Sequence, residues 1–149
     1  MADVLYLDDL QVGDTFTTAS HALDVDQVTA FASQFDPQPF HLDDAQARQS
    51  IFGGLAASGW HTAAITMRLL VTSGPRLAGG IVGAAGQVAW KVPTRPTDIL
   101  HVESDVVEIT PSRSRPDRGM VVLRSRTLNQ HDAVVQEMTA TLMVPRRPS

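Results

Sequence analysis

The sequence predicts an α+β domain in which a curled antiparallel sheet of about five strands wraps around one long buried helix. The segment from Leu55 to Val71 carries a single charge, Arg68, and apolar residues lie on almost every side of it, as expected of a buried helix. After this segment the spacing of apolar residues changes from about 3.6 residues to about 2, which is the period of a strand. Helical segments followed by strands at hairpin spacing are typical of an antiparallel α+β domain.

One strand is expected before the helices and four after them. The first should run from about Thr15 to Leu23, after a turn at Gly13 and Asp14. The later four are separated by turn-forming segments, and we expect them within residues 80–92, 98–109, 119–130 and 133–144. The chain has 149 residues and no internal repeat, so residues 1–149 are expected to form one domain.

An amphipathic helix is expected between the first strand and the buried helix. Asp24 is placed to cap its start, and Gln27, three residues later, to close a capping box. The helix should end near Asp36, because Pro37 disfavours helical geometry in the residue that precedes it. A second short helix is expected over the sequence AQARQ, which follows Asp43 and Asp44.

Composition and charge argue against several classes of function. The net charge is −4, so a nucleic-acid partner is not expected. The chain has no cysteine, which excludes disulfides and thiolate chemistry, and it has no HxH or HExxH spacing that would indicate a metal site. We see neither a secretory leader nor an apolar run long enough to span a membrane. A cytoplasmic protein without membrane or metal partners is therefore expected.

The stretch FDPQPFH, residues 35–41, holds the candidate site. Asp36 and His41 stand five residues apart with two prolines between them. Taken singly, each has an ordinary explanation, since an aspartate before a proline is a common turn former and a loop histidine often bonds a carbonyl. Together they offer a carboxylate and an imidazole, the pair of groups that suits general acid–base chemistry near neutral pH.

The chain resembles the MaoC-like dehydratases, proteins of the hot-dog fold that include the (R)-specific 2-enoyl-CoA hydratases. Their signature reads Asp-x-Asn-Pro-x-His, with a glycine eighteen residues after the histidine. The matching residues here are Asp36, Pro39, His41 and Gly59, while Gln38 stands in the place of the asparagine. The sequences VAWKVPTRPTDIL and SRSRPDRG also resemble segments of that family. The resemblance implies a hot-dog fold and hydration of a 2-enoyl thioester, or the reverse dehydration.

The resemblance also implies roles for the site residues. Asp36 and His41 would hold one water molecule, with Asp36 as the leading candidate for the base and His41 as its acid–base partner. Gly59 would let the thioester oxygen approach a main-chain N–H near the start of the buried helix. Further residues are expected to contact the substrate; near the acid–base pair they are Gln38, Phe40, Ser58 and Trp60, and for the phosphates of coenzyme A they are Lys91 and Arg95, with Arg113 and Arg115 as further candidates.

Gly59 has an alternative explanation as a close-packing residue among neighbouring alanines. If it serves the thioester, replacement by alanine should leave thermal stability unchanged or slightly raised and lower kcat/KM. If it serves packing alone, stability should fall and activity should persist. His61, two residues further on, is expected to be a helix histidine with its hydrogen bonds made, although it could line the pocket.

Two other functions compete with the hydro-lyase. Many hot-dog thioesterases use a carboxylate on the central helix, but residues 45–97 contain neither aspartate nor glutamate. A non-catalytic acyl-CoA-binding subunit is the third possibility, and the presence of both Asp36 and His41 argues against it. We expect no cofactor beyond the coenzyme A of the substrate, and we expect a homodimer or larger homo-oligomer, because an open sheet edge is normally paired.

Overall fold

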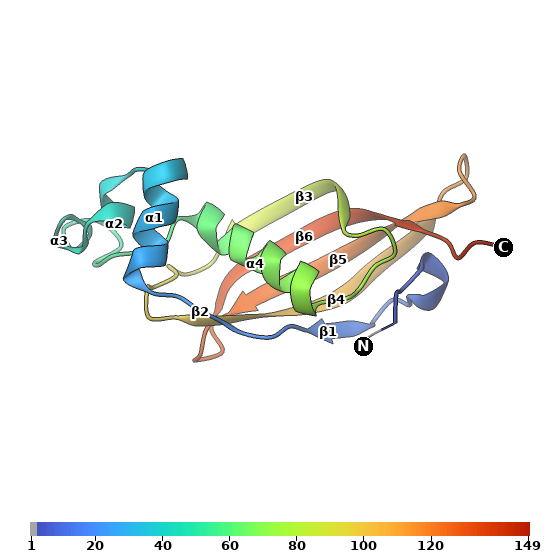
Figure 1. Cartoon of the computed structure of the whole chain (residues 1–149), viewed down its shortest axis with the longest axis horizontal. Coiled ribbons are helices and arrows are strands. Elements are labelled where there is room, and N and C mark those ends of the chain that lie inside the picture. Colours follow the sequence, from blue (N-terminus) through green and yellow to red (C-terminus); the bar gives the residue numbers. More distant parts are fainter. Residues whose placement is uncertain (1–2) are drawn as a thin grey trace.

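An antiparallel sheet forms most of the protein. The computed structural model describes residues 3–149 (Figure 1). The four long strands are β3 (Val82–Trp90), β4 (Ile99–Pro111), β5 (Arg118–Leu128) and β6 (Val134–Pro145), and the two short ones are β1 (Thr15–Thr17) and β2 (His21–Ala22). The order across the sheet is β1-β4-β5-β6-β3, and β2 also pairs with β4. This architecture confirms the predicted α+β hot-dog fold.

The sheet has six strands because the segment predicted as one strand from Thr15 to Leu23 is divided in two. Thr18 lies at the division and accounts for it. Its Oγ1 accepts a hydrogen bond from the N–H of Val102 at 2.9 Å and donates to the carbonyl of Ala19 at 2.8 Å. A side-chain hydroxyl thus replaces a backbone partner of β4, which interrupts the ladder between β1 and β2.

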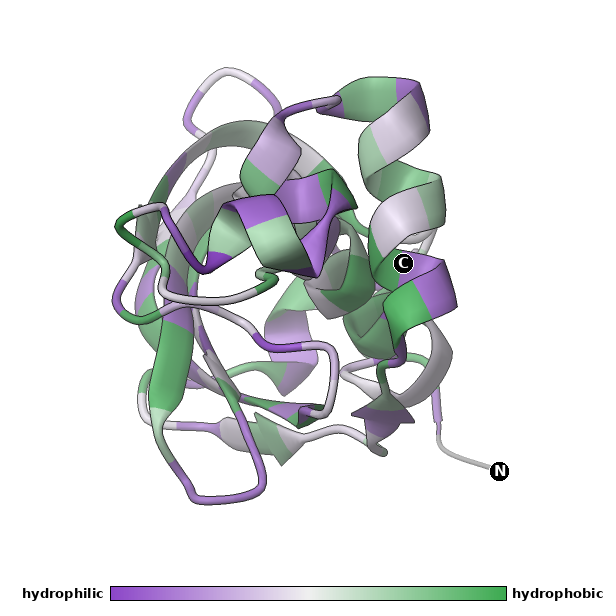
Figure 2. Cartoon of the chain, turned by 90° about the vertical axis from the view of Figure 1, so that its left-hand side faces the viewer, coloured by the Kyte–Doolittle hydropathy of each residue, from purple (hydrophilic) through white to green (hydrophobic). Residues whose placement is uncertain are grey.

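Helix α4 (Gly59–Ser73) is the long central helix, and it lies along the sheet (Figure 1). Its inward side chains Ile65, Leu69 and Leu70 pack with buried residues of β4 and β6 into one apolar cluster. Viewed from the end of the molecule, the sheet curves to one side of the helices (Figure 2). Burial of this one helix face supplies the hydrophobic stabilisation that holds helix and sheet together.

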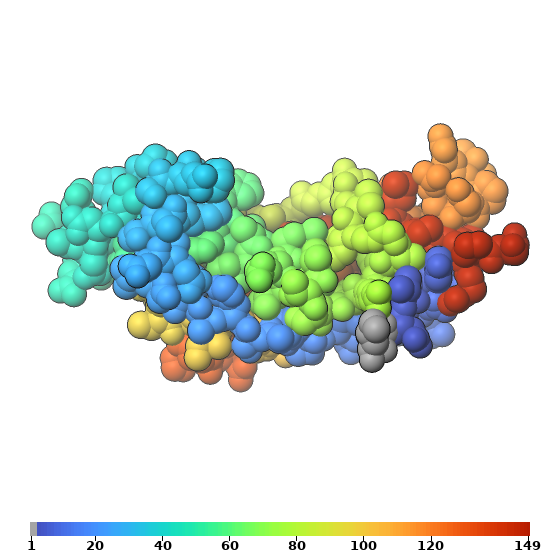
Figure 3. All heavy atoms as spheres, in the orientation of Figure 1, coloured from blue at the N-terminus to red at the C-terminus, as the bar shows by residue number. Residues whose placement is uncertain are grey.

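The structure corrects two expectations about α4. The helix begins at Gly59 and not at Leu55, because Ser58 caps it and the three residues before Ser58 are buried without being helical. Its outer face is also uncovered: Trp60, Met67 and Val71 are 60%, 40% and 62% exposed. Figure 3 shows α4 open between α1 and the segment that leads into β3. Within residues 3–149, no helix is long and apolar enough to cross a membrane.

Three shorter helices cover one end of the sheet (Figure 1). They are α1 (Val25–Phe35), α2 (Pro39–Leu42) and α3 (Asp44–Ala47); α2 was not expected. As predicted, Asp24 caps α1 by accepting from the N–H of Gln27 at 2.8 Å. The capping box is not closed, however, because the Gln27 side chain donates to the carbonyl of Ala22.

A second apolar cluster fills the opposite end of the sheet. It joins the short 3-10 helix η1 (Leu7–Asp9) to the far halves of β4, β5 and β6. Its buried members are Leu7, Leu10, Leu77, Val106, Val121, Leu123, Leu142 and Val144. The two ends of the sheet are therefore closed differently, one by three helices and the other by aliphatic packing.

Candidate active site

Asp36 and His41 are brought together by the break between two helices. Asp36 is the C-cap of α1, where its N–H donates to the carbonyl of Ala32 at 2.8 Å. Pro39 is the first residue of α2, a position where the missing N–H of proline costs no hydrogen bond. The turn between the helices places Oδ2 of Asp36 3.3 Å from Nε2 of His41. The two side chains thus form a contacting carboxylate–imidazole pair.

The ring of His41 is held in one orientation. Its Nδ1 donates to the carbonyl of Ala56 at 2.7 Å, which leaves Nε2 facing Asp36. Phe40 contacts the ring edge to face at 4.6 Å between centroids, and Phe52 lies at 5.9 Å. His41 is only 5% exposed, so its Nε2 faces Asp36 at a buried site and in a fixed direction.

Both oxygens of Asp36 accept hydrogen bonds. The amide of Gln38 donates to Oδ1 at 2.6 Å, and the hydroxyl of Ser58 donates to Oδ2 at 2.7 Å. Burial raises the pKa of Asp36, but these two hydrogen bonds, together with the charge of His41, outweigh it and lower the pKa below the ordinary carboxyl value. Asp36 is therefore ionised at neutral pH.

The start of α4 supplies a main-chain donor beside this pair. Ser58 is fully buried, and its Oγ accepts from the N–H of Trp60 while donating to Asp36. The N–H of Gly59 has no hydrogen-bond acceptor among residues 3–149. Such unpaired N–H groups at a helix N-terminus favour negative charge. A partial negative charge next to Gly59 would therefore be stabilised.

Gly59 also packs closely against Trp90. A Cβ added to Gly59 would lie 2.5 to 2.9 Å from carbons of the indole ring, which is too short for a real contact. The indole N–H of Trp90 lies 3.0 Å from both the carbonyl of Gly59 and Oε1 of Gln136, which hold the ring in place. From this contact we expect alanine at this position to lower stability, in place of the unchanged stability expected from the sequence, because the ring would have to move.

A cavity of about 240 Å³ opens beside Gly59 and His41. Its other buried lining residues are Ala57, Thr62 and Thr94, while Trp90, Lys91 and Val92 at its rim are exposed. The cavity therefore leads from solvent to the imidazole and to the N-terminus of α4. Sequence reasoning missed Thr62 and Thr94, although Thr62 follows Gly59 by three residues and so shares its helix face.

The other residues predicted to contact the substrate lie in different places relative to the cavity. Lys91 lines the cavity and is exposed. The guanidinium of Arg95 instead donates to the carbonyls of Phe52 and Gly54, so it braces the loop before α4. Trp60 points away from the core and meets Trp90 edge to face at 5.1 Å. Contact of any of these residues with the substrate stays a prediction.

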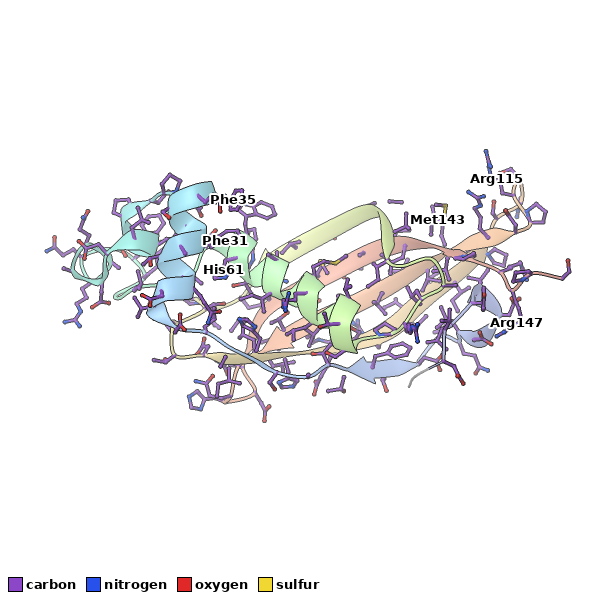
Figure 4. All side chains as sticks on the ribbon, viewed as in Figure 1. Phe31, Phe35, His61, Arg115, Met143 and Arg147 are labelled. Atoms are coloured by element: carbon purple, nitrogen blue, oxygen red, sulfur yellow. The ribbon has the colours of Figure 1, made fainter. Side chains whose placement is uncertain are left out.

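Arg115 lies at the end of the molecule opposite the helices that carry the acid–base pair (Figure 4). Arg113 belongs to the same turn between β4 and β5. Within one chain, neither arginine is therefore beside the cavity.

His61 lies on α4, and its ring faces α1 and stacks on Phe31, with 4.6 Å between ring centroids (Figure 4). Burial, and secondarily the charge of His21, lower the pKa of His61. Its buried Nδ1 has no hydrogen-bond partner within the described part of the chain, contrary to the expected satisfied histidine. Over the same residues, no three histidine or acidic side chains are grouped so as to hold a metal ion.

Comparison with known proteins shows which family the chain is similar to. The family model described as a MaoC-like domain matches residues 9–125. A crystal structure of a MaoC-like dehydratase from Rhodospirillum rubrum is 61% identical, covers 97% of this chain and 99% of its own, and superposes with a TM-score of 0.96.

Two curated proteins are similar along nearly the whole chain. The 3-hydroxybutyryl-CoA dehydratase of Methylorubrum extorquens is 31% identical over 145 residues, which are 97% of this chain and 87% of that protein. The uncharacterized protein YdeM of Bacillus subtilis is 30% identical over 141 residues, which are 94% of this chain and 99% of that protein.

Proposed function

Because the chain belongs to the MaoC-like dehydratase family, we propose that it is a hydro-lyase that adds water to the double bond of a 2-enoyl-CoA, or removes water from the 3-hydroxyacyl-CoA. One observation carries the proposal. Asp36 and His41 lie 3.3 Å apart, and the cavity is lined by His41 and by Gly59, whose N–H has no acceptor within residues 3–149. Coenzyme A enters as part of the substrate, and the reaction needs no other cofactor.

In the hydration direction, ionised Asp36 accepts a proton from water as the water oxygen bonds to C3 of the enoyl group. The electrons of the double bond move toward the thioester oxygen, and C2 then takes a proton from Nε2 of His41, which enters the cycle as the imidazolium because its other proton is held on Nδ1 by the Ala56 carbonyl. These steps leave Asp36 protonated and His41 neutral. A proton passing across the contact between Oδ2 and Nε2 restores both groups for the next turnover.

Negative charge on the thioester oxygen is the second requirement of the reaction. The N–H of Gly59 is oriented by the helix and has no other acceptor in the described chain, so it can donate to that oxygen. A donor that is fixed before the reaction needs no reorganisation when the charge forms. This arrangement supports Gly59 as the oxyanion contact.

Incubation with crotonyl-CoA tests the proposal against its alternatives. A hydro-lyase removes the conjugated double bond without releasing thiol, and a thioesterase releases free coenzyme A. A binding subunit does neither. Loss of the enoyl absorbance without thiol release supports the hydro-lyase, provided that Asp36→Asn abolishes it; thiol release, or no reaction with any 2-enoyl-CoA, contradicts it. The absence of acidic residues in α4 favours the first outcome.

We also propose a cytoplasmic homodimer formed through the free edge of β3. Residues 82–90 carry no charge and no proline, and nearly all of them are exposed. Edge strands of this kind normally pair. Trp60, Met67 and Val71 add an exposed apolar face on α4. Antiparallel pairing of two β3 strands sets the Val82 end of one protomer beside the Trp90 end of the other, so the basic turn with Arg113 and Arg115 approaches the partner's cavity.

Light scattering at micromolar concentration tests this assembly. Val71→Glu should shift the protein toward the monomer, since it places a charge on the apolar face without disturbing the core. Val12→Glu is the matched control, because Val12 is 63% exposed and lies outside β3 and α4. A wild-type protein that is monomeric and fully active contradicts the dimer.

A further inference from the structure

The bottom of the cavity is polar. Thr62 and Thr94 both line it and are only 1% and 4% exposed. The hydroxyl of Thr62 donates to Oγ1 of Thr94 at 2.9 Å. A cavity built for a plain alkyl chain would be lined here by aliphatic side chains, as most ligand pockets are.

The hydroxyl of Thr94 can donate one further hydrogen bond. A threonine hydroxyl is one donor and two acceptors, and that of Thr94 already accepts from Thr62. Its own proton has no acceptor within residues 3–149. Buried donors are nearly always paired, so a buried hydroxyl at a cavity with an unused proton indicates a ligand that accepts it.

Polar side chains continue behind these threonines. Thr66, Thr127 and Gln136 are fully buried behind them. Thr66 bonds the hydroxyl of Thr127, and the Gln136 amide donates to Thr66 at 3.1 Å. An alkyl chain that passed deeper would have to leave these groups unpaired, which is strongly unfavourable. The polar network thus closes the cavity to long chains.

Position along α4 indicates which part of the substrate meets the threonines. Thr62 lies three residues beyond Gly59 on the same helix face, a rise of about 4.5 Å. If the thioester group is at Gly59, that distance corresponds to about three or four bonds of the acyl chain, counted from its carbonyl carbon C1. The unused proton is therefore level with the fourth or fifth carbon.

We propose that the cavity selects short 2-enoyl thioesters that carry a hydrogen-bond acceptor at the fourth or fifth chain position, and that Thr94 donates to this acceptor. The inference rests on the proposed hydro-lyase function and names its substrate class. An ether, hydroxyl or carbonyl oxygen at that position would take the proton of Thr94. A longer, purely alkyl chain would meet the buried network.

A matched pair of substrates tests the proposal. In 4-methoxycrotonyl-CoA, an oxygen replaces the fifth-carbon methylene of 2-hexenoyl-CoA, and the shape of the chain is otherwise kept. We expect kcat/KM to favour the methoxy substrate about tenfold, the effect of one hydrogen bond. We expect 2-octenoyl-CoA to be the poorest of the three. Equal kcat/KM for the matched pair, or a preference for octenoyl, overturns the proposal.

Variants locate the effect at Thr94. Thr94→Val removes the hydroxyl at nearly constant shape and should abolish the preference, and Thr94→Ser should keep it. Thr18→Val is the control, because Thr18 is also a buried threonine but lies outside the cavity lining. A preference that survives Thr94→Val overturns the assignment. If Thr94→Val does not fold, Thr94→Ala supplies the same comparison.

Binding separates this inference from the proposed function. Isothermal titration with the saturated analogues, hexanoyl-CoA and 4-methoxybutanoyl-CoA, needs no turnover. A tighter Kd for the methoxy analogue that disappears in Thr94→Val supports the cavity assignment even if no enoyl thioester is hydrated, in which case only the hydro-lyase proposal fails. Equal binding of the two analogues in the wild type, with crotonyl-CoA hydrated normally, overturns the cavity assignment alone.

Discussion

The two ends of the sheet bury different kinds of side chain. At the end covered by α1–α3, the interior holds His41, Ser58, Thr62 and Thr94, and each lies in the site or lines its cavity. At the opposite end, buried aliphatic residues such as Leu123 and Leu142 pack together, and none of them belongs to the site or lines its cavity. Buried polar groups have to be paired, so they are a poor means of gaining stability. The difference indicates that one end is shaped for chemistry and the other maintains the fold.

Removal of the acid–base pair should give the largest effect. Asp36→Asn and His41→Ala should each lower kcat by ~10²–10⁴, because proton transfer loses its positioned group. Melting temperature should change little for Asp36→Asn, which keeps the size of the side chain, and should fall for His41→Ala, which empties a buried site. Asp43→Asn is the control, because Asp43 caps α3 and contacts neither residue. Near-normal kcat for either variant would exclude that residue from the mechanism.

A substitution that leaves a cavity in the aliphatic end should lower stability and leave activity unchanged. Leu142→Ala should destabilise the protein by about 2–5 kcal/mol, because Leu142 is buried in a fully apolar cluster. The folded protein should keep its kcat/KM, which is measured below the melting transition seen by circular dichroism. Val107→Ala, at a 40% exposed position, should have little effect. A large loss of kcat/KM in folded Leu142→Ala would mean that the two ends are not functionally separate.

Gly59→Ala tests whether Gly59 serves packing against Trp90, the oxyanion contact, or both. The added methyl collides with the Trp90 ring, so we expect a stability loss of about 1–3 kcal/mol together with a lower kcat/KM. The double variant Gly59→Ala/Trp90→Ala makes room for the methyl and separates the causes. If the double variant is as stable as Trp90→Ala but has a lower kcat/KM, the oxyanion role of Gly59 is supported. Restored activity would assign Gly59 to packing.

Ser58→Ala should give the smallest change, and it should appear in the pH profile. The ionised form of Asp36 is present above its lowered pKa and is lost as the pH falls through that value. Without the Ser58 hydroxyl, the pKa of Asp36 rises, so the acid limb of kcat/KM should move to higher pH, with a decrease of about tenfold at the optimum.

Asp24→Ala is the matched control for Ser58→Ala. It also removes a helix cap, but it leaves the carboxylate of Asp36 untouched. An acid limb that moves equally in both variants would show that Ser58 acts only on helix stability.

The fold was predictable because its signals are local. The strand period, the proline after Asp36 and the Asp24 cap each act within a few residues, and the structure bears them out. The split of the first strand depends on the Thr18 hydroxyl reaching Val102, 84 residues away in the chain. No local pattern reveals such a contact.

The site was predictable only in part for the same reason. The spacing of Asp36 and His41 suggested a pair, and the structure places them in contact. Ser58 was expected to meet the substrate, yet its hydroxyl bonds Asp36 across 22 residues. Arg95 has the charge expected of a phosphate ligand, but its guanidinium donates to loop carbonyls. Charge and spacing suggested candidate residues, and tertiary contacts determined what each one bonds.

The contact of Trp60 with Trp90 has a consequence for spectroscopy. These are the two tryptophans of the chain, and their rings lie 5.1 Å apart at the cavity end. Intrinsic tryptophan emission therefore reports on the cavity end and is silent about the aliphatic end, whereas far-ultraviolet circular dichroism reports on the whole sheet. If the cavity end opens before the sheet melts, the emission transition will precede the dichroic one on heating, and a bound thioester will bring the two transitions together.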